Sequence, residues 1–373
     1  MIRVVVVDDS VVVRRMLSDM LNGDSRISVV ATAPNGAIAL QKLTQVNPDL
    51  VLLDVDMPDM DGIETVQRLR ETFPRLPVIM CSSLTARGAD ATLRAIAAGA
   101  TDYVTKPTAA VTQVDRLESF KTQLLEKVLA LGHASLLPGA LRPPRLPSMP
   151  TLAPVVRLGR EPIEALCIGC STGGPNALTE LLREIPADLA VPIFIVQHMP
   201  PLFTKMLAEP LSASSGLRVI EAEHGASVEP GSVYVAPGDN HMMLGRDGVR
   251  VVTLLNREPP ENSCRPAVDV LFRSAARLYG GGALACVLTG MGQDGTRGAR
   301  DIVEAGGTVI VQSAETCVVA SMPGSVVAAR LADKVLPLNE LALEIVTRVR
   351  KSFGERPRLT DLPKREAQNV RNG

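Results

Sequence analysis

Short, unbroken runs of valine, isoleucine and leucine alternate with segments of helical spacing through the first third of the chain. Runs that are apolar on both faces are typical of strands buried in a parallel sheet, which helices cover on both sides. The sequence therefore predicts an N-terminal α/β domain of five βα units. Its expected strands are 2–7, 27–33, 49–54, 78–81 and 101–105, and its expected helices are 11–21, 36–43, 63–72, 87–98 and 114–131.

A proline-rich stretch ends this alternation. Of the 28 prolines, those at 138, 143, 144, 147, 150, 154 and 162 fall within one short segment. Proline blocks helix and strand pairing alike, so this segment is expected to be a semi-extended linker. Buried-type strands are expected again at 165–168, 191–197, 283–289 and 308–312, with a further strand at 233–236 and a hairpin pairing 242–245 with 249–253.

The chain is thus expected to hold two α/β domains. The predicted parts are an N-terminal (βα)5 domain at 1–132, a linker at 133–162, a doubly wound parallel-sheet domain with an inserted antiparallel hairpin at 163–353, and a tail without fixed structure at 354–373.

Composition excludes several classes of protein. With 39 basic and 40 acidic residues the net charge is −1, which argues against a nucleic-acid binder. No apolar run is long enough to span a bilayer, and Met1 is followed by no signal-peptide pattern. We therefore expect a cytoplasmic protein without membrane insertion, whose 6 cysteines stay reduced.

Charged residues mark the strand ends of the first domain. Asp8 and Asp9 follow the first strand, Asp54 ends the third, and Lys106 follows the fifth. In open α/β sheets the carboxyl ends of the strands form the functional crevice, and converging carboxylates there favour Mg²⁺. The Lys106 ammonium and the Ser82 hydroxyl are suited to binding a phosphoryl group. Each residue alone has a structural interpretation, such as a helix cap at Asp9-Ser10 or a turn at Lys106-Pro107.

Three strand ends of the second domain offer a nucleophile, a base and an acid. Ser171 lies in a small-residue turn that exposes its hydroxyl, His198 follows another strand, and Asp294 follows a third. Two alternatives stay open here. The 169–174 loop resembles a weak dinucleotide-binding loop, although no acidic residue follows at the right distance. Cys167 and Cys170 have redox-type spacing, although Cys167 falls within a strand.

The first domain resembles a response-regulator receiver domain, on Val7-Asp8-Asp9-Ser10, Leu53-Asp54-Val55-Asp56-Met57-Pro58, Gly62, Ser82-Ser83 and Lys106-Pro107. This resemblance implies that Asp54 is the phosphoacceptor for a chemotaxis histidine kinase. It implies phosphoryl contacts from Ser82 and Lys106, and an aromatic switch residue at Tyr103. The implied Mg²⁺ site uses Asp8, Asp9, Asp54 and the backbone carbonyl near Asp56.

The second domain resembles the chemotaxis protein-glutamate methylesterase family. The matching segments are 169–174 (GCSTGG), 197–200 (QHMP), 235–242 (VAPGDNHM), 265–272 (RPAVDVLF) and 288–295 (LTGMGQDG). Cys170 departs from the family, which usually has alanine there.

This second resemblance implies phosphorylation-activated hydrolysis of glutamate γ-methyl esters on the cytoplasmic helices of chemoreceptors, and deamidation of receptor glutamines. Ser171 would be the nucleophile, His198 the base and Asp294 its orienting acid. The amides of Thr172 and Met291 are candidate oxyanion donors, and no cofactor is expected in this domain. It also implies that the unphosphorylated receiver covers the catalytic cleft. Arg265 is a candidate for contacting receptor carboxylates or simply begins a surface helix. A catalytically inactive docking module and a nucleotide-dependent oxidoreductase are the rival functions, whereas no basic recognition helix supports DNA binding.

Overall fold

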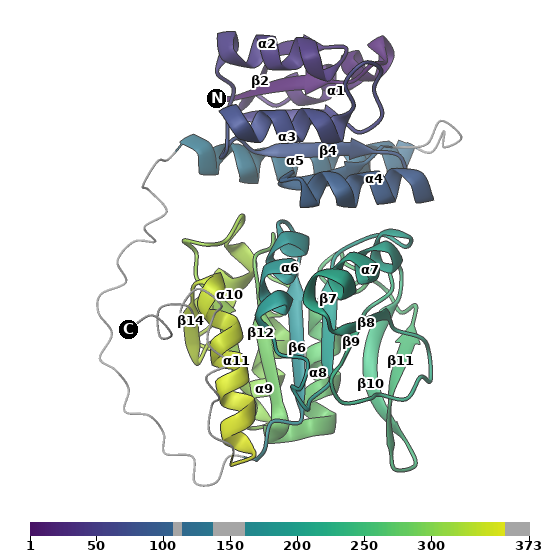
Figure 1. The fold of residues 1–373 in the computed structure, drawn as a ribbon, viewed down its shortest axis with the longest axis vertical. Helices are drawn as coiled ribbons and strands as arrows, with labels where there is room; N and C mark the ends of the chain where they lie inside the picture. Colours follow the sequence, from purple (N-terminus) through teal and green to yellow (C-terminus); the bar gives the residue numbers. More distant parts are fainter. Residues whose placement is uncertain (107–113, 137–160, 355–373) are drawn as a thin grey trace. The chain divides into compact units, whose positions relative to one another are not determined.

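A computed structural model describes residues 1–106, 114–136 and 161–354 of the 373-residue chain (Figure 1). The chain divides into two compact units, Met1–Arg145 and Leu146–Gly373. Residues 137–160 of the predicted linker (133–162) and residues 355–373 of the predicted tail (354–373) lie outside the described residues. Within the described residues, no helix is both long and apolar enough to cross a membrane.

The first unit is a five-stranded parallel sheet with the strand order β2-β1-β3-β4-β5. From β1 the chain moves to β2 in one direction along the sheet, and from β2 it moves back to β3 in the other direction. Because both crossovers are right-handed, the helices α1 and α2 lie on opposite faces of the sheet. Its elements are β1 (Ile2–Val7), α1 (Val11–Asn22), β2 (Ile27–Ala33), α2 (Gly36–Val46), β3 (Leu50–Asp54), α3 (Gly62–Thr72), β4 (Val78–Ser82), α4 (Ala86–Ala97), β5 (Asp102–Thr105) and α5 (Val114–Leu136).

Each of the five predicted βα units is present. The central strands β1, β3 and β4 are buried almost throughout, as their continuous apolar runs indicate. Helix α5 runs on to Leu136, into the first residues that the sequence assigned to the linker.

The second unit is built on a seven-stranded parallel sheet with the order β14-β13-β12-β6-β7-β9-β8. Its elements are β6 (Ala165–Cys170), α6 (Gly174–Glu184), β7 (Ile193–Gln197), α7 (Phe203–Ser215), β8 (Arg218–Glu221), β9 (Ser232–Val235), β10 (His241–Asp247), β11 (Arg250–Asn256), α8 (Val268–Tyr279), the 3-10 turn Gly280–Gly282, β12 (Ala283–Val287), α9 (Thr296–Glu304), β13 (Thr308–Gln312), α10 (Ser321–Ala328), β14 (Lys334–Leu336) and α11 (Leu338–Ser352).

Helices cover both faces of this sheet. Helices α11, α6 and α7 pack side by side on one face, and α8 and α9 lie on the other (Figure 1). The predicted hairpin forms its own two-stranded antiparallel sheet, β10–β11, which packs on α8.

The architecture agrees with the predicted α/β class, but two short edge strands were not predicted. Both β8 and β14 are short and partly exposed, so neither carries the continuous apolar run that marks a buried strand.

Both sheets reverse their strand order near their centre, and this reversal positions the sites. In the first sheet the reversal lies between β1 and β3, and in the second it lies between β6 and β12. A crevice opens at the carboxyl ends of strands where the order reverses, because the following loops diverge to opposite sides. Asp8, Asp9 and Asp54 lie at the first reversal, and Ser171 and the 288–294 loop lie at the second.

Candidate active site

The first crevice gathers three carboxylates. Asp8, Asp9 and Asp54 each offer an oxygen, and these atoms all lie within 4.8 Å of one another. Ser10 caps α1 by accepting the amide of Val13, so the cap leaves Asp9 free to face the crevice. A compact group of oxygen ligands of this kind fits a hard divalent cation such as Mg²⁺.

Lys106 joins two of these carboxylates. Its Nζ lies 2.7 Å from Asp8 Oδ2 and 2.7 Å from Asp54 Oδ1. Burial by itself would lower the pKa of Lys106, but the hydrogen bonds to Asp54 and Asp8 outweigh it and raise that pKa. The ammonium is therefore held charged in the crevice.

Asp54 is buried, and this burial raises the pKa of its carboxyl to about 6, with Asp8 adding to the rise and Lys106 opposing it. The Val55 amide donates to Asp54 Oδ1 over 2.8 Å and fixes the carboxylate. A glycine is required beside this strand end, because a Cβ on Gly62 would lie 2.3 Å from the Asp54 carbonyl oxygen.

The remaining residues predicted for this crevice differ in their surroundings. The Ser82 hydroxyl is buried and donates to the Gly88 carbonyl over 2.9 Å. Tyr103 is buried beneath Lys127, whose Nζ lies 5.1 Å from the ring centroid. The side chain of Asp56 is exposed and is not in the carboxylate cluster, which leaves its backbone as the predicted ligand.

The second crevice begins at the turn after β6. Ser171 donates its amide to the Thr289 carbonyl over 3.0 Å, so the turn is attached to the loop that follows β12. Gly173 has a φ of +77° and lets α6 start directly after the serine. Gly290 must be glycine, because a Cβ there would lie 2.9 Å from Ser171 Cβ and 2.2 Å from Met322 Sδ.

Two of the three predicted catalytic side chains are in direct contact. His198 Nε2 lies 2.8 Å from Asp294 Oδ2, and the two residues are 96 positions apart in the chain. The His198 amide donates to the Cys170 carbonyl over 3.2 Å, which attaches this loop to the end of β6 beside Ser171. The ends of β6, β7 and β12 thus meet at one edge of the sheet.

Asp294 is buried and accepts further hydrogen bonds from the start of α8. The amide of Val268 donates to Oδ2 over 2.6 Å, and that of Asp269 donates to Oδ1 over 3.0 Å. Burial would raise the pKa of Asp294, but the bond to His198 and these amides lower it overall. In return, Asp294 raises the pKa of His198 against the effect of burial.

His198 Nδ1 faces a residue that sequence reasoning missed. Cys264 Sγ lies 3.4 Å from Nδ1, whereas no hydrogen bond among the described residues joins Ser171 Oγ to His198. Asn262, in the same turn as Cys264, donates to both Asp294 Oδ1 and Asp269 Oδ2 over 2.9 Å each. In the sequence, the only feature that pointed to Asn262 and Cys264 was their position just before 265–272, one of the segments that carry the family resemblance.

The amides of Thr172 and Met291 satisfy one requirement for oxyanion donors. Across the described ranges of the chain, neither amide has a hydrogen-bond acceptor. Thr172 is buried and directly follows the serine, and Met291 follows Gly290, whose Cα lies against Ser171. Both amides are therefore free to bind an external oxygen.

Other sequence candidates have structural roles. Cys167 and Cys170 are buried in β6, and burial raises the pKa of both thiols. His241 is buried and accepts the Ala267 amide at Nδ1 over 3.2 Å. Arg265 binds Asp239 through Nε over 3.0 Å and also donates to the carbonyl of Glu258, so its guanidinium is already engaged within the chain.

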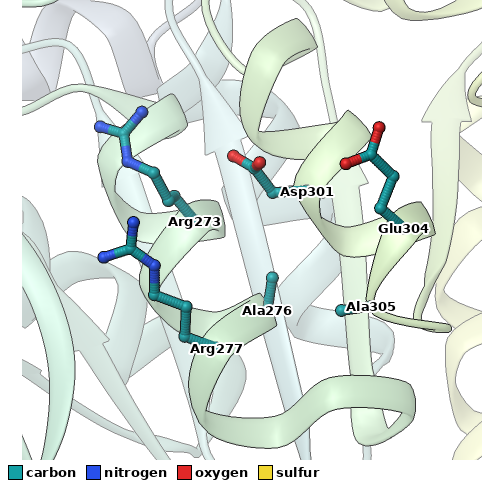
Figure 2. Close-up of a pocket in the computed structure, with 6 residues that line it drawn as sticks. All are labelled: Arg273, Ala276, Arg277, Asp301, Glu304 and Ala305. Carbon is teal, nitrogen blue, oxygen red and sulfur yellow. The ribbon is translucent and has the colours of Figure 1, made fainter.

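A cavity of ≈190 Å³ lies between α8 and α9, and Figure 2 shows the residues that line it. Arg273 and Arg277 extend from α8, and Asp301 and Glu304 extend from α9. The cavity contains none of the predicted site residues.

Fold and site together define a class of protein. A receiver-type sheet with an acidic crevice precedes an α/β domain with a hydrolase-type Ser, His and Asp set at one sheet edge. Comparisons with known proteins agree. A family model described as CheB methylesterase matches residues 166–345, and one described as Response regulator receiver domain matches residues 4–118.

Similar full-length proteins are also known. A protein-glutamate methylesterase/protein-glutamine glutaminase of Trichodesmium erythraeum is 48% identical over 93% of this chain and 99% of its own length. One from a Nocardioides strain is 49% identical over 96% of this chain and 97% of its own length. The crystal structure of the Thermotoga maritima CheB methylesterase catalytic domain is 45% identical, with a TM-score of 0.48 over 49% of this chain and 97% of that one. The chain belongs to the CheB methylesterase family of chemotaxis enzymes, in the form that carries a response regulator receiver domain.

Proposed function

We propose that this protein hydrolyses glutamate γ-methyl esters on the cytoplasmic helices of chemoreceptors, releasing methanol, and deamidates receptor glutamines. The observation that carries this proposal is the 2.8 Å contact between His198 Nε2 and Asp294 Oδ2 at the sheet edge where Ser171 lies. A histidine oriented by a buried carboxylate beside a serine is the arrangement that acyl transfer requires.

The contacts of His198 assign a role to each ring nitrogen. Because Asp294 accepts a hydrogen bond at Nε2, the neutral ring carries its proton there and Nδ1 has the free lone pair. In the proposed reaction Nδ1 takes the proton of Ser171 as Oγ attacks the ester carbonyl. The imidazolium that forms is stabilised by Asp294, and it returns the proton to the leaving methoxide.

The charge that develops on the carbonyl oxygen needs donors that are already in place. The Thr172 and Met291 amides are proposed for this role because both lie beside Ser171 and neither donates to an acceptor among the described residues. Water activated by His198 then hydrolyses the acyl-enzyme. An amide carbonyl reacts through the same steps and releases ammonia, which accounts for the glutaminase activity.

The receiver domain is proposed as the regulatory input. Asp54 would accept a phosphoryl group from a chemotaxis histidine kinase, with Mg²⁺ held by Asp8, Asp9, Asp54 and the Asp56 carbonyl. Bound Mg²⁺ neutralises charge between the carboxylates and the phosphoryl oxygens. Lys106 already contacts Asp54, and Ser82 would exchange its bond to Gly88 for one to the phosphoryl group. Each of these partners acts in the cytoplasm, where we place the enzyme.

The test of the proposal is methanol release from methylated receptor. Ser171→Ala should fold normally and lose activity by roughly 10⁴- to 10⁶-fold. Ser214→Ala is the matched control, because that hydroxyl only meets the Leu211 carbonyl on α7. A fluorophosphonate should label wild-type protein at Ser171. Substantial methanol release by Ser171→Ala would refute the assignment, and an absence of labelling would favour a docking module.

A further inference from the structure

The residues from Glu261 to Cys264 form a closed turn beside the catalytic histidine. The Glu261 amide donates to the Cys264 carbonyl over 3.2 Å, and the Cys264 amide donates to the Glu261 carbonyl over 2.8 Å. Both central residues, Asn262 and Ser263, have positive φ angles of 51° and 62°. Such a turn normally uses glycine or asparagine, so holding a serine there requires firm anchoring.

The anchors of this turn include the catalytic carboxylate. Glu261 forms an ion pair with Arg273 of α8. Asn262 Nδ2 donates to Asp294 Oδ1 and to Asp269 Oδ2, each over 2.9 Å. The turn is therefore fixed to the same groups that fix Asp294, and its geometry cannot change independently of the catalytic site.

This turn places the Cys264 thiol beside Nδ1 of His198, the ring nitrogen that acts as the base in the proposed function. Cys264 Sγ lies 3.4 Å from His198 Nδ1, while Nε2 is bonded to Asp294. Nδ1 is the atom that must accept the serine proton in the proposed function. The imidazole ring thus has a partner on each side, a carboxylate on one and a thiol on the other.

We propose that Cys264 is a positioning residue of the esterase, whose thiol donates to His198 Nδ1 and holds the ring in place until Ser171 replaces it as the donor. This inference rests on the proposed role of His198 as the base. It adds a fourth side chain to the catalytic set and explains why Nδ1 is occupied in the absence of substrate.

A thiol is well suited to this task because S–H is a weak hydrogen-bond donor. It restrains rotation of the ring, yet the stronger hydroxyl donor of Ser171 displaces it at small cost. A serine at position 264 would keep a donor, but its shorter C–O bond would hold the oxygen farther from Nδ1. An alanine would leave the ring without a partner on that side.

The first test compares variants at position 264 in the full-length protein. Cys264→Ala should lower kcat by roughly tenfold, since one weak hydrogen bond is lost, and leave KM unchanged. Cys264→Ser should fall between wild type and Cys264→Ala. Ser263→Ala is the matched control in the same turn, because that side chain is exposed, and it should behave as wild type.

The pH profile of kcat separates positioning from packing. The ionisable groups facing the ring are Asp294 and Cys264, with Asp269 behind Asp294. Burial lowers the pKa of His198, and the hydrogen bond to Asp294 opposes this effect and raises that pKa overall. A thiol that donates to Nδ1 binds the lone pair of the neutral ring and so favours the neutral imidazole. Removing this donor in Cys264→Ala should therefore move the acid limb to higher pH, whereas Cys264→Ser, which keeps a donor, should move it less. An unchanged kcat and acid limb would overturn the proposal, as would a loss of kcat matched by a lowered Tm in both variants.

A chemical test on the wild-type protein does not depend on how the variants fold. Iodoacetamide alkylates sulfur, forming a C–S bond as iodide leaves and the thiol proton passes to water. The other five cysteines are Cys81, Cys167, Cys170, Cys286 and Cys317, and burial raises the pKa of each. Cys264 should therefore be modified first, with matching loss of methanol release, and Cys264→Ser should keep its activity under the same treatment.

The outcomes distinguish this inference from the function on which it rests. If Ser171→Ala retains activity, the proposed function itself fails. If Ser171→Ala is inactive but protein fully alkylated at Cys264 still releases methanol at the wild-type rate, only the role of Cys264 is refuted.

Discussion

Two buried aspartates illustrate how partners decide the chemistry of a residue. Asp294 receives the imidazole of His198 and backbone amides at the start of α8, and its pKa is lowered. Asp54 has one amide and Lys106 but also faces Asp8, and its pKa is raised to about 6. The first carboxylate therefore stays ionised, as the orienting role that we propose for it requires. The second is poorly stabilised as an anion, which suits the cation binding and phosphorylation that we propose for it.

Replacing the orienting carboxylate should separate the two effects of Asp294. Asp294→Asn should lower kcat by about 10⁴-fold, because an amide no longer fixes the proton at His198 Nε2. Since Asp294 raises the pKa of His198, its loss should move the acid limb of the residual activity to lower pH. Methanol release measured across pH tests both effects. Asp301→Asn, in the cavity of Figure 2, should match wild type, and an unchanged acid limb in Asp294→Asn would contradict the assignment.

The raised pKa of Asp54 predicts how magnesium binding depends on pH. A carboxyl with a raised folded-state pKa favours folding below its unfolded pKa, and this contribution is lost as pH rises through about 6. Magnesium binds the ionised form, so it should raise the Tm of the receiver transition well above that pH and have little effect near pH 4. Thermal melts with and without MgCl₂ provide the measurement. Asp9→Asn should weaken the effect, and an equal Mg²⁺ stabilisation at both pH values would contradict this prediction.

At the scale of elements, close approach between two loops builds the crevice of the second domain. The turn after β6 and the loop after β12 meet where Gly290 lies against Ser171 and Met322. Gly290→Ala should displace the serine or the Met291 amide and lower kcat by roughly 10²-fold or more, because misplacement of about 1 Å costs that much. Gly324→Ala on α10 is the matched control, since its Cβ would meet nothing within 4 Å. Full activity in Gly290→Ala would show that this close contact between the two loops is not required for methanol release.

Elements with strong periodic patterns were predictable, and those fixed by tertiary contacts were not. The buried runs of β1, β3, β6 and β12 identified their strands, and parallel strand ends brought Asp8 near Asp54 and His198 near Asp294. The edge strands β8 and β14 had no such signal. The Glu261–Cys264 turn was also missed, because its positive φ angles and its bonds to Asp294 and His198 arise only in the folded chain.

At the scale of the whole molecule, the two sites occupy the same topological position in their sheets. Each lies where a parallel sheet reverses its strand order, and each domain contributes a separate chemistry at that edge. The receiver has the cluster of Asp8, Asp9 and Asp54, and the second domain has the contact between His198 and Asp294 at the sheet edge where Ser171 lies. The similarity to methylesterase relatives extends over nearly the whole chain and therefore includes both domains. The regulation that we propose therefore requires a signal from Asp54 to reach Ser171.

A phosphodonor should reveal this coupling. Acetyl phosphate with Mg²⁺ should raise methanol release by the full-length protein, because phosphorylation of Asp54 adds charge and acceptor oxygens that reorganise the receiver. Asp54→Asn should keep the basal rate and lose the increase, while Ser171→Ala should be inactive with or without the phosphodonor.

A second comparison tests whether the unphosphorylated receiver restrains the esterase by covering its cleft. In that case the segment 161–373 alone should be faster than the unphosphorylated full-length protein and indifferent to acetyl phosphate. If the segment is no faster, the receiver does not act by covering the cleft, and activation must come from improved binding of the receptor. The KM for methylated receptor decides between these two routes, because uncovering a cleft leaves the chemistry at Ser171 unchanged whereas recruitment by the phosphorylated receiver lowers KM only in the intact chain.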